Sequence, residues 1–145
     1  MTPQRVTLIT LGVADLTRSK TFYAALGWVP TSDEGEVVFY QINGMVLGFF
    51  GLEPLAKDQG RPDAKLGTGA MTLAQNFETE AEVDAAYAQA IAAGAEALKA
   101  PEKVFWGGYS GYYADPDGHV WEVAHNPFWP LNTDGSLTLP APDAD

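Results

Sequence analysis

The sequence predicts an α+β fold in which two βαβββ modules form a cupped mixed sheet. Three observations predict it. The 145 residues suffice for one domain with a proper core but not for two independent domains. The order of strand-like and helix-like segments in the first half recurs in the second. Each half has one segment with helical apolar spacing, whose helix would cover one face of its sheet. The other sheet faces would then curl around a shared space, where we expect a ligand cleft.

The composition excludes several classes of protein. It is 46% hydrophobic, 12% aromatic and 19% charged, as in a folded globular domain. The absence of cysteine excludes disulfides, thiolate metal ligands and cysteine nucleophiles. The formal net charge of −11 disfavours nucleic acid and anionic membrane surfaces as partners. No stretch approaches about 18 uninterrupted apolar residues and no signal pattern opens the chain. We therefore expect a cytoplasmic protein.

The first module is expected over about residues 5–51. A strand rich in β-branched and leucine residues, 6–13, leads into a helix capped by Asp15. This helix, 16–26, is followed by Gly27, where a glycine C-cap is favoured. Three further strands are expected, the last two joined by the Asn43-Gly44 hairpin signal, at 28–31, 37–42 and 45–51.

The second module is expected over about residues 68–127 and repeats this order. Its helix begins at a capping box that starts at Thr79 and has Glu82 at its third helical position. An apolar stripe at helical spacing follows and is closed by Gly94. The strands of this module are expected at 70–77, 95–99, 105–113 and 119–126.

The two modules form a single domain over residues 1–128. Residues 52–67 are expected to be a surface linker, because they contain Pro54, Gly60 and Pro62 without apolar periodicity. Residues 129–145 form a C-terminal tail.

Two motifs bracket the folded region. The first is Gly12-Val13-Ala14-Asp15-Leu16, continued by Ser19, Phe22-Tyr23 and Leu26-Gly27-Trp28; the second is the run from Tyr113 to Val123, YADPDGHVWEV. Both resemble the vicinal oxygen chelate superfamily, which includes glyoxalases, bleomycin-resistance proteins and extradiol dioxygenases. The resemblance implies the glyoxalase/bleomycin resistance-like fold. It also implies a homodimer, for which Phe128 and Trp129 are candidate contacts.

The resemblance further implies four positions for the ligands of a divalent metal. By our alignment they are occupied here by Leu8, Gly48, Thr72 and Glu122. Only Glu122 can ligate well, because leucine and glycine have no donor and a hydroxyl is a poor ligand for these metals. A shift of the alignment would add Gln75, which still gives only two ligands. We expect no cofactor; the alternative is a divalent metal, Zn, Ni, Mn or Fe, bound through Glu122.

Polar residues within apolar strands are the other candidates for the cleft. Glu122 is the candidate catalytic residue, as a general base or ligand anchor if it faces a concave interior; the alternative is a solvent-facing glutamate at the rim. Of the neighbouring amides Gln75 and Asn76, one is expected to point into the cleft and the other to bond across strands. His125, at the end of its strand, either contacts the ligand or simply terminates the strand.

Aromatic residues gather around three glycines between Phe105 and Tyr113. This mixture suits a ring-lined wall on which a flat ligand stacks, and the alternative is a bent strand with core aromatics. Trp106, Tyr109 and Phe49 are expected to line the cleft. Phe39 and Phe50 are expected in the core. A shift of one residue along a strand would exchange its two faces.

The sequence supports two functional hypotheses. The first is a metal-independent protein of the bleomycin-resistance type that binds a small organic ligand, aromatic or cationic, in an aromatic-lined cleft. Its basis is the loss of metal ligands together with the negative charge, which attracts cations. The second is a metal-dependent lyase or dioxygenase of the glyoxalase or extradiol type that uses Glu122.

Overall fold

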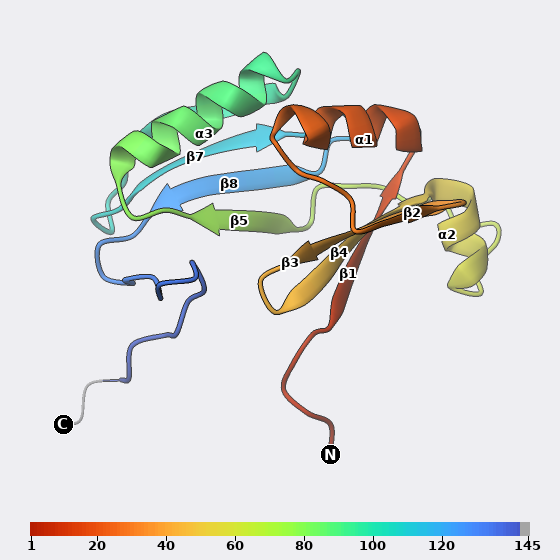
Figure 1. The fold of residues 1–145 in the computed structure, drawn as a ribbon, viewed down its shortest axis with the longest axis horizontal. Helices are drawn as coiled ribbons and strands as arrows, with labels where there is room; N and C mark the ends of the chain where they lie inside the picture. Colours follow the sequence, from red (N-terminus) through yellow and green to blue (C-terminus); the bar gives the residue numbers. More distant parts are fainter. Residues whose placement is uncertain (143–145) are drawn as a thin grey trace.

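The computed structural model describes residues 1–142 and has two βαβββ modules in sequence (Figure 1). Residues 143–145, the end of the expected tail 129–145, lie outside the described residues. The first module is β1 Leu8–Val13, α1 Leu16–Ala25, β2 Ser32–Glu34, β3 Val37–Ile42 and β4 Met45–Gly51. The helix α2 Leu52–Asp58 follows it. The second module is β5 Thr72–Asn76, α3 Glu80–Ala92, β6 Glu96–Lys103, β7 Tyr109–Ala114 and β8 Val120–His125.

The modules build two four-stranded sheets of the same topology. Their strand orders are β1-β4-β3-β2 and β5-β8-β7-β6. In each sheet the first strand of the module pairs in parallel with the last, and the other pairs are antiparallel. The predicted α+β class is confirmed, and the mixed sheet is divided into one sheet for each module.

The two main helices begin and end where the sequence predicts. Asp15 caps α1 by accepting a hydrogen bond from the backbone N–H of Arg18 (3.2 Å). Thr79 caps α3 by accepting from the backbone N–H of Glu82 (3.1 Å), and its own hydroxyl lies 3.0 Å from the Glu82 carboxylate, which completes the capping box. Both helices are followed by a glycine at positive φ, a conformation that favours glycine.

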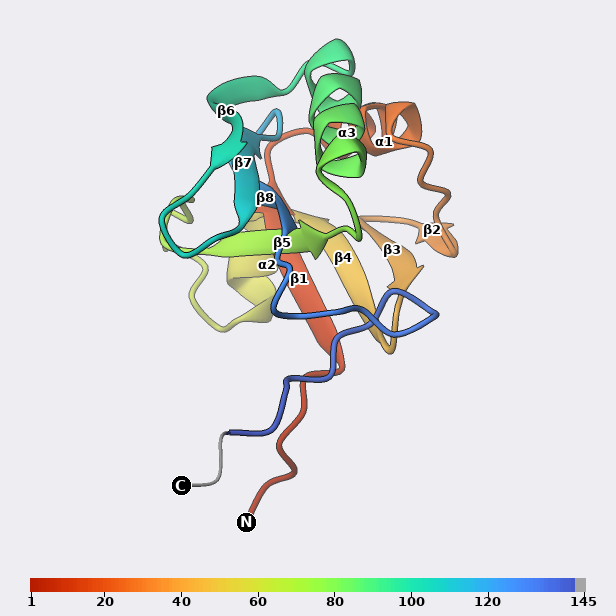
Figure 2. The same cartoon turned by 90° about the vertical axis from the view of Figure 1, so that its left-hand side faces the viewer.

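One hydrophobic core is shared by both modules. Helices α1 and α3 lie side by side over the same side of the two sheets (Figures 1 and 2). Tyr23 of α1 is fully buried and stacks on Phe49 of β4, with 4.6 Å between the ring centroids. Trp121 and Val123 of β8 belong to the same cluster. Because residues of both modules fill one core, the two modules are expected to unfold together.

The strand expected at 95–99 continues to Lys103, and the strand expected at 105–113 begins only at Tyr109. Two other expected segments also differ in the structure. The second strand is Ser32–Glu34 and not 28–31, because Trp28 packs against Tyr23 in the core instead of pairing with β3. The segment 52–67, expected to be a surface linker, begins with the helix α2. This helix is too short to show apolar periodicity in the sequence. Pro54 is tolerated because it lies in the first turn, where backbone N–H groups have no helical partner. Leu55 and Ala56 bury the helix against the domain.

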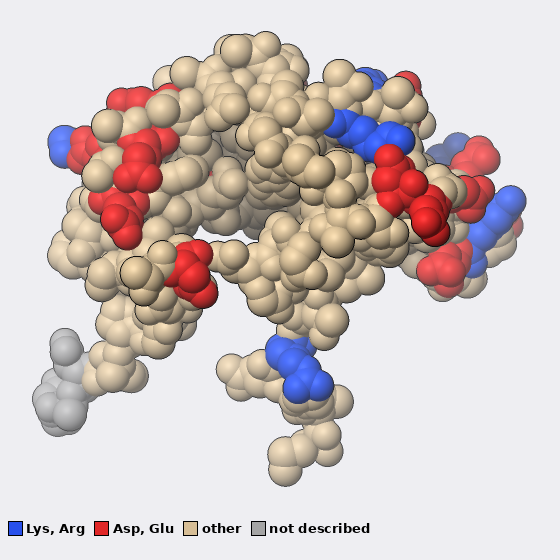
Figure 3. Space-filling view, in the orientation of Figure 1, with Lys and Arg blue, Asp and Glu red and all other residues tan. Residues whose placement is uncertain are grey.

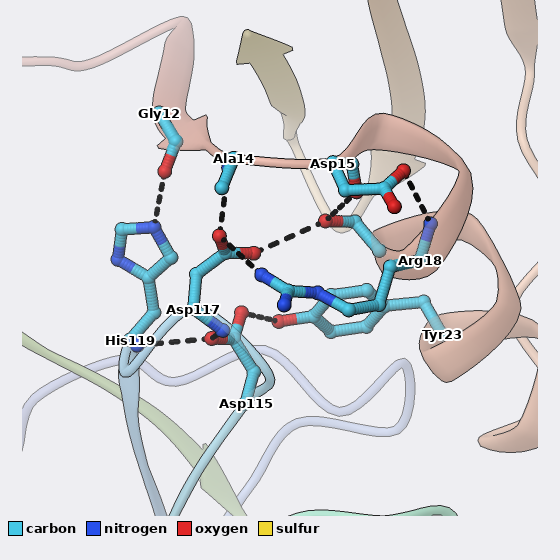
Figure 4. Close-up of polar contacts among 9 residues, drawn as sticks. Gly12, Ala14, Asp15, Arg18, Tyr23, Asp115, Asp117 and His119 are labelled. Carbon is cyan, nitrogen blue, oxygen red and sulfur yellow. Dashed lines mark hydrogen bonds and ion pairs between the residues drawn. The ribbon is translucent and has the colours of Figure 1, made fainter. Parts of the chain in front are cut away.

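A buried carboxylate joins the helix α1 to the turn between β7 and β8 (Figure 4). Asp115 is 4% exposed. Its Oδ2 accepts a hydrogen bond from the Tyr23 hydroxyl (2.7 Å), and its Oδ1 accepts from the backbone N–H groups of Asp117 and His119 (both 2.9 Å). The indole N–H of Trp121 donates to the Tyr23 oxygen (2.9 Å). The polar groups of Asp115, Tyr23 and Trp121 are therefore satisfied, whereas the buried hydroxyl of Tyr40, in the same core, has no hydrogen-bond partner among the described residues.

The same turn also holds the strand β1. Asp117 accepts hydrogen bonds from the backbone N–H of Ala14 (2.8 Å) and the Arg18 guanidinium (2.9 Å). The Gly12 carbonyl accepts from Nε2 of His119 (2.7 Å). These contacts, drawn in Figure 4, place the turn of module two against the β1–α1 connection of module one. The closing motif YADPDGH is thus a link between the modules.

The buried tyrosine predicts how stability depends on alkaline pH. Burial, and then the negative charge of Asp115, raise the pKa of Tyr23 far above its usual range. The unfolded chain loses this proton above about pH 10, whereas the folded protein keeps it. The free energy of unfolding is therefore expected to fall above about pH 10, by up to about 1.4 kcal/mol per pH unit for each such tyrosine.

Urea denaturation between about pH 8 and pH 11 measures this effect. The Tyr23→Phe variant, which has no phenol to titrate here, is expected to have a shallower alkaline slope. A smaller slope remains, since burial also raises the pKa of Tyr113. Parallel slopes in the two proteins would show that Tyr23 is not responsible.

Candidate functional site

The sheet faces that the helices leave free surround a hollow. Figure 3 shows it between the two modules, opening toward the side from which both chain ends leave. In module two, every second residue of β5 and β8 faces away from the core. These residues help to line a cavity of about 510 Å³, completed by the loop before β7 and the chain after β8. Its lining is Ala74, Asn76, Trp106, Glu122, Ala124, Asn126, Phe128 and Trp129.

Glu122 lies at the centre of this face. Its strand β8 runs between β5 and β7, and its neighbours in register are Ala74 and Tyr112. The small Ala74 leaves space beside the carboxylate. Burial, and then the negative charge of Glu122, raise the pKa of the Tyr112 phenol. The pair therefore consists of a half-buried carboxylate, which is an acceptor for a ligand, beside a neutral hydroxyl.

Glycines let two aromatic rings form one wall of the cavity. The Trp106 ring lies against the backbone of Gly108, in the space that a Cβ on Gly108 would occupy. The Phe128 ring is 3.0 Å from the place where a Cβ on Gly107 would be. Gly107 also has a φ of 96°, which other residues rarely adopt. Larger residues at 107 and 108 would push both rings out of these positions.

The C-terminal tail connects the cavity to module one. After Phe128 and Trp129, a short bridge pairs Leu131 with Leu137. The side-chain amide of Asn43, in the β3–β4 turn, donates a hydrogen bond to the backbone carbonyl of Asp134 (2.6 Å). The tail therefore runs from the end of β8 in module two to the hairpin of module one.

Three of the predicted site residues come together in this cavity: Asn76, Trp106 and Glu122. Of the two neighbouring amides, Asn76 is the one that faces it. Gln75 is on the helix side of the sheet, where it lines a different cavity together with Trp28 and Ala86, and so does not reach the Glu122 cavity. The alternation of side chains along a strand separates the two.

The other predicted site residues lie elsewhere. The hydroxyl of Tyr109 donates to Asp84 of α3 (2.6 Å), so its side chain is on the helix side of β7. Nδ1 of His125 donates to the Phe77 carbonyl (3.0 Å) and the ring lines a different, smaller cavity. Each of these two residues is adjacent in sequence to a residue on the cavity face. The prediction that Tyr109 and His125 line the Glu122 cavity is therefore wrong by one residue along the strand.

The facing of the phenylalanines in β3 and β4 is also corrected. Phe49 was expected in the cleft but is fully buried in the core, stacked on Tyr23. Phe39 and Phe50 were expected in the core but are half-buried on the opposite face. The shift by one residue that the sequence left open explains all three.

Sequence reasoning missed two lining residues of the site and one neighbour of Glu122. Tyr112 is adjacent to Glu122 only through the pairing of β7 with β8, and this register was not known. Phe128 and Trp129 were considered as dimer contacts, whereas here they line the cavity. Because side chains alternate along a strand, Ala124 and Asn126 lie on the same face as Glu122. This alternation could have located the edge of the face that Phe128 and Trp129 cover.

The residues at the four implied ligand positions do not fit a divalent metal. Leu8, Gly48 and Thr72 add at most one hydroxyl to the carboxylate of Glu122. At Gly48 the Phe39 ring lies 3.0 Å from where a Cβ would be, so it fills the space of a ligand side chain. Within residues 1–142 there is no group of three or more His, Cys, Asp or Glu side chains that could hold a metal ion.

The comparisons with known proteins agree with this fold. A sequence model of the Glyoxalase/Bleomycin resistance protein/Dioxygenase superfamily matches residues 5–123. The chain belongs to this superfamily. The resemblance of its two motifs to the vicinal oxygen chelate superfamily is thereby confirmed. A search of curated proteins gave no match.

Three solved structures are similar over 82% to 96% of the chain. A glyoxalase-related enzyme from Fulvimarina pelagi is 42% identical with a TM-score of 0.90, covering 96% of this chain and 100% of that chain. Lactoylglutathione lyase from Agrobacterium tumefaciens is 22% identical with a TM-score of 0.69, covering 90% and 100%. A family enzyme from Burkholderia phytofirmans PsJN is 21% identical with a TM-score of 0.72, covering 82% and 96%. The last two likenesses concern the fold alone.

Among the described residues, none of the helices has the length and apolar character needed to span a membrane.

Proposed function

We propose that this superfamily member binds a small organic molecule, aromatic and positively charged, in the Glu122 cavity without a metal ion. This is a binding function of the bleomycin-resistance type. The observation that carries it is the presence of one carboxylate and three aromatic side chains in the lining of a single cavity: Glu122 together with Trp106, Phe128 and Trp129.

Physical chemistry selects this class of ligand. A cation gains from the charge of Glu122 and from the electron-rich faces of the aromatic rings. A flat ring gains from stacking against Trp106 and Phe128. Asn76 adds an amide that can donate or accept a hydrogen bond. The formal net charge of −11 raises the concentration of cations near the surface as a whole.

Calorimetric titration with three probes of similar shape tests the proposal: benzyltrimethylammonium, neutral benzyl alcohol and anionic benzoate. The cation is expected to bind most tightly. Glu122→Gln is expected to weaken binding of the cation about tenfold and to change binding of benzyl alcohol little. Trp106→Ala is expected to weaken both, because it removes a stacking surface.

Two further variants serve as controls for this titration. Glu96→Gln removes an equal charge from exposed β6, away from the cavity, and is expected to leave affinity within about twofold. Gly108→Ala keeps every polar group but displaces the Trp106 ring, and is expected to resemble Trp106→Ala. The proposal fails if all three probes bind equally or if Glu96→Gln has the same effect as Glu122→Gln.

A second function, catalysis of the glyoxalase type, is favoured by one observation. The relative from Fulvimarina pelagi, 42% identical, is described as a glyoxalase-related enzyme. In this alternative Glu122 is a general base beside the neutral Tyr112 hydroxyl, or it binds a metal with unconventional partners. Near-stoichiometric zinc, nickel, manganese or iron in the purified protein, lost in Glu122→Ala, would favour the enzyme over the binding protein.

We also propose that the protein forms a homodimer. Phe128 is 64% exposed and Trp129 is 41% exposed in the single chain. A second copy could bury these rings and close the open side of the cavity. Sedimentation velocity at micromolar concentration is the measurement, and a monomer there would contradict the proposal.

A further inference from the structure

A second cavity lies where the two modules meet. Its volume is about 500 Å³, and it is enclosed by α2, the chain that follows α2, β1 and the first residues of β5 and β8. In Figure 1 the chain that follows α2 runs from that helix to the start of β5. We propose that this cavity binds an organic anion, a carboxylate or phosphate group joined to a small apolar group. The proposal is independent of the Glu122 cavity, with which it shares no lining residue.

The inner part of the cavity is apolar. Leu52 and Leu55 of α2 and Leu66 of the following chain lie over Gly12 of β1, which has no side chain to fill the space. Leu73 and Val120 extend this surface into module two. An apolar group placed here is removed from water, which favours its binding.

The outer part of the cavity is positively charged. Arg61 and Lys65 line it, and no Asp or Glu does. Neither cation forms a salt bridge within residues 1–142. The whole chain has 19 acidic and 8 basic residues, so this charge is opposite to the overall balance. Two unneutralised cations beside an apolar surface match an anion that carries an apolar group.

The Arg61 side chain is oriented without being neutralised. Its Nε donates a hydrogen bond to Oε1 of Gln59 (3.0 Å), and its Nη2 donates to the same oxygen. Because the partner is an uncharged amide, the guanidinium keeps its full charge and its remaining N–H groups. Those groups can donate to both oxygens of a carboxylate or phosphate.

The chain beside these cations provides further donors. Within the described part of the molecule, no backbone N–H from Leu66 to Ala70 donates a hydrogen bond to another residue. These peptide N–H groups are therefore free to donate to the oxygens of a bound anion. His119 also lines the cavity, but its Nε2 already donates to the Gly12 carbonyl, so Arg61 and Lys65 are the cations that meet the ligand.

Calorimetric titration with probes that share a six-carbon chain tests this site: hexanoate, hexyl phosphate, neutral hexanamide and hexylammonium. The two anions are expected to bind about tenfold or more tightly than hexanamide. Their order tells whether a carboxylate or a phosphate is preferred, and either order supports the site. Hexanamide binding as tightly as both anions, or no anion binding at about 10 mM, would overturn the proposal.

Paired double variants locate the binding. Arg61→Gln/Lys65→Gln is expected to weaken binding of the anions about tenfold or more. Arg5→Gln/Lys57→Gln removes the same charge from positions that do not line the cavity, and is expected to change affinity by less than about twofold. Equal losses in both double variants would mean that only net charge matters, which overturns the site. Glu122→Gln is expected to retain binding of the anions, which separates this test from that of the proposed function.

Discussion

Replacing Asp115 by alanine is expected to lower the free energy of unfolding by about 3 kcal/mol, because one buried and two part-buried donors lose their acceptor, and an unsatisfied buried donor costs about 1–3 kcal/mol. These donors are the Tyr23 hydroxyl and the backbone N–H groups of Asp117 and His119. The loss lies at the contact between the modules, and a cooperative decrease in stability is therefore expected. Urea denaturation followed by tryptophan fluorescence measures it.

The matched control is another aspartate. Asp33 forms an exposed ion pair with Lys20 (3.2 Å), and such pairs contribute about 0–1 kcal/mol. Asp33→Ala is therefore expected to change the stability little. A loss for Asp115→Ala no larger than that for Asp33→Ala would show that the buried network does not hold the modules together.

Replacing Gly111 by alanine is expected to cost about 2–3 kcal/mol, because the added methyl group has no space. Gly111 is buried in β7, and a Cβ there would lie 2.8 Å from the Pro101 nitrogen and 2.9 Å from the Lys99 carbonyl oxygen. These are backbone atoms of β6, so a side-chain rotation cannot relieve the contact. The pairing of β6 with β7 has to shift, and this pairing already has irregularities between residues 97 and 102.

Gly67 is the matched control for this substitution. No atom lies within 4 Å of a Cβ at this position. Gly67→Ala is therefore expected to be neutral, or slightly stabilising because alanine restricts the unfolded chain. Thermal unfolding of the two variants beside the wild type measures both effects. An equal melting temperature for Gly111→Ala and the wild type would refute the predicted contact.

Local signals predicted the elements that depend on neighbouring residues. The capping residues Asp15 and Thr79 begin their helices as expected, since a cap acts over three residues. The Asn43-Gly44 turn joins β3 and β4 as expected, because the positive φ of Gly44 is a local requirement. The helix α2 was missed because packing of its Leu55 against Gly12 of the distant strand β1 stabilises it, and the sequence of so short a segment cannot reveal this packing.

The candidate site was predicted only in part for a related reason. Glu122 and Asn76 were found because they are polar residues in apolar strands. Recognising them does not require the register in which the strands pair. Phe49, Tyr109 and His125 were misplaced by one residue, and each such shift moves a side chain to the other face. Tyr112 became a neighbour of Glu122 through strand pairing across a turn. The cations of the second cavity lie in a segment whose sequence contains no periodic signal.

The sequence by itself determined the class of fold, the two modules, the helix caps, the superfamily and the loss of donor side chains at the implied metal positions, because each of these depends on residue type and short-range order. Only the tertiary structure decided which faces meet. It placed Phe39 over Gly48, Trp106 over Gly108 and Asp115 beneath Tyr23. The physical reason is that the facing of a strand is set by burial against segments far away in the chain, and the pattern along one strand is compatible with more than one such arrangement.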